Sequence, residues 1–234
     1  QWFCKGGTDL EYYEEYKSRA MNFLLGLGFK PEHLRFKDHD KLAHYAKSAC
    51  DIQYLFPIGW SELNGIHDRT DYDLSRHQEY SGKNMNYLDP TTGEKFIPYV
   101  VEYSIGADRL MLAVLCEAYE EEELEGGDVR TVMHFHPALA AYEAAVLPLQ
   151  KNLSEKAKEV YKQLSKRFMC TYDEAGSIGK RYRRQDEIGT PFCITIDFDT
   201  LENGTVTVRD RDTMAQIRLD IDAVAPYIEK TMEH

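Results

Sequence analysis

An acidic segment that ends in two glycines divides the apolar patterns of this chain into two parts. Residues 120–123 are all glutamate, and Gly126 and Gly127 follow shortly after them. The run interrupts the apolar pattern, and paired glycines suit the end of a helix followed by a linker. The sequence therefore predicts two domains, residues 1–127 and 128–234.

The first part combines helical and strand patterns. Apolar and aromatic residues recur at helical spacing over residues 10–27, and residues 41–48 are a second, shorter helical candidate. Between residues 52 and 101 the pattern is strand and loop. Residues 96–102 have the composition of a buried strand, and residues 107–122 are expected to form the helix packed behind it.

The second part alternates strands with helices, which indicates a compact α/β domain with a mixed sheet. Its clearest signal is a hairpin, in which apolar residues alternate with polar ones from Phe192 to Phe198 and again at Val206 and Val208, around a turn at residues 202–204. The expected elements in chain order are a strand at 144–149, a helix at 154–168 capped by Ser154, a strand at 169–172, a basic helix at 178–185, this hairpin, and a closing helix after Asp212 or Thr213.

The charge is distributed unevenly along the chain. The formal net charge is −12, with 14 basic against 24 acidic residues in 1–130 and 14 against 16 in 131–234. Within residues 151–184 the balance reverses to 10 basic against 4 acidic residues. This local excess is able to neutralise phosphates in an acidic protein, although a solvated basic helix face is an equally good interpretation of charge alone.

Cysteine usage and hydropathy limit the class of protein. The five cysteines are odd in number, widely spaced and without a C-x-x-C pair, so neither a disulfide framework nor a zinc ribbon is expected. The sequence has no apolar run long enough for a membrane span and no pattern of signal-peptide type. We expect a cytoplasmic protein, and the start at Gln1 suggests that an upstream part is missing.

Two stretches concentrate residues that carry chemistry. Residues 60–74 place carboxylates, an arginine and aromatics between glycines, and carboxylates are what a pocket for a small ammonium ion needs. Without context, a polar surface loop would explain this stretch equally well.

The second stretch, residues 101–110, has the pattern of a strand that leads into a helix. Residues two apart share a face of a strand, so Glu102 and Ser104 are able to point into one pocket. Gly106 then opens a helix on which Arg109 would reach phosphate oxygens. Taken alone, this pattern is also typical of a structural strand-to-helix junction.

Together these stretches resemble one family. Residues 102–109 resemble motif 3 of the class II aminoacyl-tRNA synthetases, and residues 60–74 resemble the segment that precedes motif 3 in the glycyl-tRNA synthetases of the single-chain type. The resemblance continues, in order, through residues 38–51, 177–192 and 207–212. It implies the end of an antiparallel-sheet catalytic domain followed by a smaller, mixed-sheet α/β anticodon-binding domain.

The resemblance also implies an activity, which is the ATP-dependent ligation of glycine to its tRNA through a glycyl-adenylate. The implied partners are glycine, ATP and glycine tRNA, with magnesium as cofactor and a homodimer as the full-length state. The residues implied for glycine binding are Glu62, Glu102, Tyr103, Ser104, Ile105 and Gly106; those for ATP are Glu62, Leu63, Gly106, Ala107, Asp108 and Arg109; those for the tRNA are Lys180, Arg181, Arg183, Arg184, Glu187 and Arg209; and Glu102 is a possible magnesium ligand.

The sequence departs from the family pattern in two respects. Tyr103 stands where the family usually has proline, which leaves the backbone between Glu102 and Ser104 less restricted. Motif 1 and the motif 2 loop are absent, so the chain is expected to be inactive alone. A non-catalytic RNA-binding or regulatory paralogue is the alternative hypothesis.

The remaining histidines are expected to be structural. His134 and His136 lack a nearby cysteine or carboxylate in the sequence, which disfavours a metal pair. His39 and His44 are five residues apart and do not share a helix face well.

Overall fold

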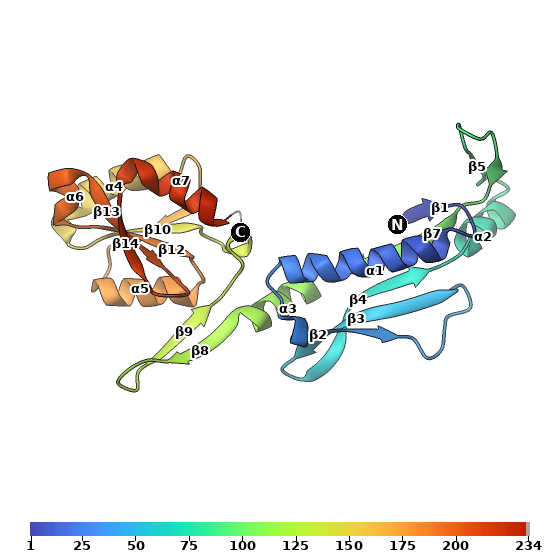
Figure 1. The fold of residues 1–234 in the computed structure, drawn as a ribbon, viewed down its shortest axis with the longest axis horizontal. Helices are drawn as coiled ribbons and strands as arrows, with labels where there is room; N and C mark the ends of the chain where they lie inside the picture. Colours follow the sequence, from blue (N-terminus) through green and yellow to red (C-terminus); the bar gives the residue numbers. More distant parts are fainter. Residues whose placement is uncertain (233–234) are drawn as a thin grey trace. The chain divides into compact units, whose positions relative to one another are not determined.

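The structure, a computed structural model, describes residues 1–232 as two compact units, Gln1–Cys116 and Glu117–His234 (Figure 1). The predicted fold class is confirmed, because the first unit contains an antiparallel sheet and the second a mixed sheet with helices. Within the described residues, no helix is both long and apolar enough to cross a membrane.

The first unit is built on a five-stranded sheet, here called the first sheet, with strand order β1-β7-β4-β3-β2 and antiparallel pairing throughout. Its strands are β1 (Trp2–Cys4), β2 (Leu34–Asp38), β3 (Ser48–Phe56), β4 (Gly59–Asp68) and β7 (Tyr99–Ile105). The other elements are α1 (Asp9–Gly26), α2 (Tyr72–Ser81), a small hairpin of β5 (Tyr87–Leu88) and β6 (Lys95–Phe96), and α3 (Ala107–Ala118).

Helices α1 and α3 cover one face of the first sheet. Their apolar residues, such as Leu24 and Ala113, are fully buried against Ile52 and Ile66 from the strands. The opposite face of the sheet therefore has to carry the polar residues that alternate with these core positions.

Most predicted elements of the first unit are present, with two differences. The helix predicted at 41–48 is wrong: His44 and Tyr45 lie in a turn, where their rings pack against Tyr72. Tertiary contacts thus override local propensity. The helix predicted at 107–122 ends at Ala118, and the acidic residues belong to a strand.

The acidic run is one strand of a hairpin, and the expectation of a linker there is wrong. β8 (Tyr119–Glu123) pairs with β9 (Val129–Met133), and Gly126 and Gly127 form the turn with positive φ angles of 96° and 80°. The boundary expected between residues 127 and 128 falls in this turn, whereas the compact units divide after Cys116.

The second unit contains the second sheet, with strand order β11-β10-β12-β13-β14. β10 pairs in parallel with β11 and β12, and the other pairs are antiparallel. Its elements after the hairpin are β10 (Ala144–Pro148), α4 (Ser154–Leu164), β11 (Cys170–Tyr172), α5 (Ile178–Glu187), β12 (Phe192–Ile196), α6 (Phe198–Asn203), β13 (Thr205–Asp210), β14 (Gln216–Asp220) and α7 (Ile221–Met232).

Helices pack on both faces of the second sheet. Val146 and Ile194 face α4 and α7, while Ala145, Leu147 and Cys193 face α5. Every residue of β10 and β12 is buried, as expected for strands covered on both sides.

Three predicted details of the second unit are wrong. The strands β12 and β13 do pair, but the short helix α6 connects them in place of a tight turn. A strand, β14, precedes the closing helix. Ser154 is the first residue of α4 and not its cap, and it donates a hydrogen bond to Glu174.

Two buried carboxyl groups meet beneath the first sheet. Asp9 and Asp68 are both fully buried, and Lys47 Nζ lies 2.5 Å from Asp9 Oδ2. Burial raises the pKa of Asp68 to about 6, and the neighbouring Asp9 carboxylate adds to this effect. The Oδ2 atom of Asp68 is buried without a hydrogen-bond partner, an environment that disfavours the charged form of the carboxyl group.

This geometry predicts that Asp68→Asn alters the pH dependence of stability. The folded pKa of Asp68 lies above the unfolded one, so its contribution is complete below about pH 4 and is lost as pH rises through about 6. The wild type should lose about 1–3 kcal/mol of unfolding free energy across this range, and Asp68→Asn should not. Trp2 and Trp60 both lie in the first unit, so tryptophan fluorescence during urea unfolding measures it. The exposed Asp40→Asn is the control, and equal pH slopes in Asp68→Asn and wild type would contradict the assignment.

Candidate functional site

An extra residue in β4 decides which side chains share the uncovered face of the first sheet. The register shifts between Ile52 and Gln53, so that Ile52 pairs with Asn64 and Gln53 pairs with Glu62. Leu63, the extra residue, is buried in the core. Because the bulge resets the alternation, Glu62 lies on the same face as the residues opposite the core positions of β4.

Strand β7 completes this open face. Val101, Tyr103 and Ile105 pack into the core, which leaves Glu102 and Ser104 on the other side. The two residues share a face, as the sequence pattern predicts. Tyr103, the departure from the family pattern, directs its bulk into the core, where burial raises the pKa of its hydroxyl.

Opposite β7, the open face carries further polar residues. Gly65 pairs with Ser104 and His67 pairs with Glu102 across the β4–β7 ladder. A Cβ atom on Gly65 would lie 2.8 Å from Cε1 of His67, so a side chain at this position would require the imidazole to shift. Burial lowers the pKa of His67 and favours the neutral ring. His39 Nε2 lies 2.9 Å from Asp51 Oδ1 beside it.

The carboxylate of Glu102 has two neighbours. Its Oε1 lies 3.6 Å from Arg69 Nη1, and its Oε2 accepts a hydrogen bond of 3.1 Å from the Gln1 side chain. Glu62 on the neighbouring strand is exposed. The open face therefore presents two carboxylates from adjacent strands, with Ser104 exposed beside them.

The strand-to-helix junction places Arg109 at one end of β4. Residues 106–109 are exposed, and Arg109 Nη2 donates a hydrogen bond of 2.6 Å to the Ser61 hydroxyl, next to Glu62. The guanidinium also lies 5.7 Å from the centre of the Phe56 ring. An exposed arginine in the first turn of α3, held by a neutral hydroxyl, keeps its charge available for an anion.

Possible metal ligands gather at two places within residues 1–232, and Glu102 belongs to neither. One group is His39, Asp51 and His67, and the other is Glu120, Glu122 and His134. A magnesium ion held by Glu102 alone would compete with the guanidinium of Arg69.

The predicted RNA-binding residues separate into two classes. Arg181 and Arg209 are buried, with exposed fractions of 4% and 5%. Arg181 donates hydrogen bonds to the carbonyl oxygens of Pro148 and Gly176, and Arg209 pairs with Asp186. Little of either side chain is accessible in this fold, so their burial disfavours the RNA contacts predicted for these two residues.

The other four residues lie at the surface of α5. Lys180 and Glu187 are exposed. Arg183 lies 2.5 Å from Asp128, and Arg184 lies 2.5 Å from Asp173. The basic excess counted in the sequence is thus partly neutralised by acidic partners in the same unit.

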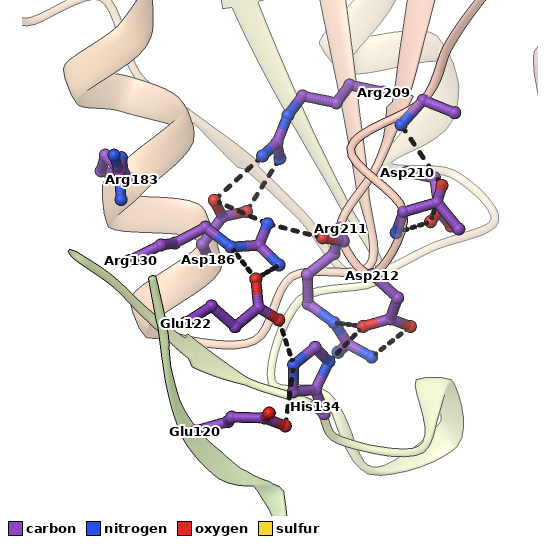
Figure 2. A network of polar contacts seen from close by, with 12 residues as sticks. Glu120, Glu122, Arg130, His134, Arg183, Asp186, Arg209, Asp210, Arg211 and Asp212 are labelled. Carbon is purple, nitrogen blue, oxygen red and sulfur yellow. Dashed lines mark hydrogen bonds and ion pairs between the residues drawn. The ribbon is translucent and has the colours of Figure 1, made fainter. Parts of the chain in front are cut away.

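Arg209 and a second buried arginine, Arg130, form a network around Asp186, which Figure 2 shows. Asp186 is fully buried and accepts two hydrogen bonds from Arg209, of 2.8 and 3.0 Å, while Arg130 lies 3.4 Å away. Arg130, almost fully buried on β9, also pairs with Glu122 at 2.7 Å and donates to the Arg211 carbonyl. Four elements, β8, β9, α5 and β13, are joined by these charges.

His134 extends the network to Asp212 (Figure 2). Its Nε2 lies 2.9 Å from Glu122 and its Nδ1 lies 2.6 Å from Asp212. These carboxylates could not be predicted as neighbours of His134, because the hairpin and the loop after β13 bring them from other positions in the chain. Both ring nitrogens are engaged, so His134 links the β8–β9 hairpin to the loop after β13. The sequence argument against a metal pair, that no carboxylate lies near His134, does not hold in the structure.

Comparisons with known proteins define the class. Residues 143–231, which contain the second sheet, match the family model described as the anticodon binding domain. The chain is 63% identical over 239 residues to the glycine–tRNA ligase of Clostridium perfringens, covering 100% of this chain and 51% of that protein. It is 61% identical to the enzyme of the same name from Clostridium beijerinckii, with the same coverage, and 55% identical to that of Acetivibrio thermocellus, covering 98% and 50%.

An anticodon-binding domain that follows an antiparallel sheet defines a part of an aminoacyl-tRNA synthetase. The chain belongs to the glycyl-tRNA synthetases and corresponds to their C-terminal part. It spans about half the length of the curated relatives it matches.

The network around Asp186 predicts a large loss of stability in Asp186→Ala. Removing this carboxylate leaves Arg209 and Arg130 buried without it, which should cost about 3–5 kcal/mol. Asp128→Ala removes the exposed partner of Arg183 and should cost under about 1 kcal/mol. Hydrogen exchange of β13, compared between the two variants, measures the difference. Similar protection in both would show that the buried network is not what stabilises this unit.

Proposed function

We propose that the protein of which this chain is a part activates glycine with ATP and transfers it to glycine tRNA. The observation that carries the proposal is the open face of the first sheet, where Glu62, Glu102 and Ser104 share one side. The relatives named glycine–tRNA ligase support the same assignment.

The carboxylates supply the recognition of glycine in this proposal. Glu62 and Glu102 hold the ammonium group, because a cation taken from water needs charged and hydrogen-bonding partners. Ser104 continues the site along β7 and Gly106 follows the strand, while Tyr103 and Ile105 support the site from the core. A pocket of this kind orients the glycine carboxylate without an enzyme nucleophile.

The junction between β7 and α3 borders ATP. Glu62 and Leu63 lie on β4 and residues 106–109 begin α3, so the two segments meet where Arg109 contacts Ser61. When the glycine carboxylate attacks the α-phosphorus, Arg109 neutralises charge on the phosphates as pyrophosphate leaves. Magnesium bound together with ATP would supply further neutralisation of the phosphate charge.

The second unit binds the anticodon arm. Lys180, Arg183 and Arg184 contact phosphates from the exposed side of α5, and Glu187 lies at the end of the same surface. Phosphate contacts position the RNA, and base contacts give specificity. A homodimer is the expected state of the full-length protein, and the cytoplasm its location.

A non-catalytic paralogue remains the second candidate. It would keep the tRNA-binding surface and lack glycine-dependent exchange of pyrophosphate into ATP. The presence of Glu62, Glu102 and Ser104 on the open face, with Arg109 in the first turn of the adjoining helix α3, favours the ligase.

Glu62→Ala in the full-length protein should lose glycine-dependent pyrophosphate exchange by about two orders of magnitude or more, because half of the anionic charge facing the ammonium is removed. Glu79→Ala, an exposed carboxylate on α2, is the control. Unchanged exchange in Glu62→Ala would remove this residue from the site, and no exchange in the wild type would favour the paralogue.

The salt dependence of RNA binding tests the second unit. Replacing Lys180 and Arg184 by Ala should flatten the log–log salt dependence by roughly 0.7 per lost contact on single-stranded RNA. Replacing Lys162 and Lys166, near α4 on the opposite side of the sheet, makes the same change in charge and should leave the slope unchanged. Filter binding of glycine tRNA and of another tRNA across a salt series measures both. Absence of binding at low salt, or equal slopes in both double variants, would contradict the assignment of this surface.

A further inference from the structure

Arg69 joins the backbone turn after β4, the helix α2 and the carboxylate of Glu102. We propose that Arg69 is a positioning residue, which keeps the Glu102 carboxylate aimed at the ammonium group of the substrate. The inference rests on the proposed function and adds a residue outside the glycine and ATP sets named above.

The Arg69 side chain is fixed from three directions. Its Nε and Nη2 donate to Asp73, at 2.6 and 3.2 Å, and its guanidinium lies 4.2 Å from the centre of the Tyr45 ring. The third nitrogen, Nη1, lies 3.6 Å from Glu102 Oε1. The hydrogen bond from Arg69 lowers the pKa of Asp73, so the pair stays charged. Only 19% of the Arg69 side chain is exposed, which limits its alternative positions.

The backbone around Arg69 is equally constrained. The Arg69 amide donates to the Val100 carbonyl, and the Val100 amide donates to the Thr70 carbonyl, both at 2.9 Å. Thr70 has a φ of 54°, a conformation that β-branched residues rarely adopt, and Asp68 Oδ1 accepts a hydrogen bond from its amide. A strained residue held in this way indicates that the surrounding structure requires the conformation. The two backbone hydrogen bonds to Val100 hold Arg69 against β7, two residues before Glu102.

The charges explain why the arrangement suits an ammonium ligand. Arg69 carries one positive charge and lies between the carboxylates of Asp73 and Glu102. The three side chains together therefore have a net charge of one negative unit. At 3.6 Å, Arg69 is beyond good hydrogen-bond distance from Glu102, while Asp73 takes its shorter contacts. Glu102 is therefore held in place electrostatically and keeps hydrogen-bonding capacity for a second cation.

Steady-state pyrophosphate exchange by the full-length protein tests this role. Arg69→Lys keeps the charge but loses the planar contact with Asp73 and the stacking on Tyr45. We expect it to raise the KM for glycine roughly tenfold while the KM for ATP changes less than about twofold. Asp73→Asn should act in the same direction, because it frees Arg69 to neutralise Glu102, and it tests the proposal if Arg69→Lys does not fold.

Arg76→Lys is the matched control, because Arg76 also pairs with a glutamate, Glu79, and lies 5.4 Å from a tyrosine ring, but on the exposed side of α2. The double variant Arg69→Lys with Glu102→Gln should be no worse for glycine than Glu102→Gln alone, since Arg69 acts through Glu102.

Three outcomes overturn the positioning role while the wild type remains active. These are an equal rise in both KM values, an additive double variant, and no change in either Arg69→Lys or Asp73→Asn. A wild type without glycine-dependent exchange would overturn the proposed function and the positioning role together.

Discussion

The single extra residue in β4 is the constraint on which the candidate site depends. Strand side chains alternate between faces, so a regular β4 would place Glu62 with the core residues Ile66 and Cys50. The bulge at Leu63 buries an apolar side chain and returns Glu62 to the open face. The two carboxylates of adjacent strands then lie on the side that no part of α1 or α3 covers. One inserted residue therefore decides whether Glu62 faces the core or the open face.

The second unit depends on a different device, the buried carboxylate of Asp186. It pairs with Arg209 of β13 and Arg130 of β9, and further ion pairs join His134 and Arg211 to Asp212 (Figure 2). An unpaired guanidinium could not remain in this interior, so the arginines fix the position of the β8–β9 hairpin and of α5. The surface that remains for RNA is consequently smaller than the count of basic residues suggests.

The parts of the fold that could be predicted are those in which the pattern is local. The helix α1 and the strand β10 have regular apolar spacing, and both lie where the sequence places them. The acidic strand β8 could not be predicted, because its stability comes from pairing with β9 and from ion pairs with Arg130 and His134. In the same way, the sequence shows that Arg209 is charged but not that Asp186 lies beside it.

For the site, a family resemblance named the residues and the structure supplied their arrangement. Glu102 and Ser104 follow from strand alternation alone, whereas Glu62 requires the bulge, which a single sequence does not reveal. His67 and Arg69 are visible in the sequence as polar residues, and only the strand register shows that they adjoin Glu102.

A crystal structure of the full-length protein with a non-hydrolysable glycyl-adenylate analogue tests the central claim most directly. The account predicts the glycine ammonium within hydrogen-bond distance of Glu62 and Glu102 on the open face of the first sheet, with the adenylate phosphate towards Arg109. An analogue bound on another surface, or with its ammonium away from both carboxylates, would contradict it.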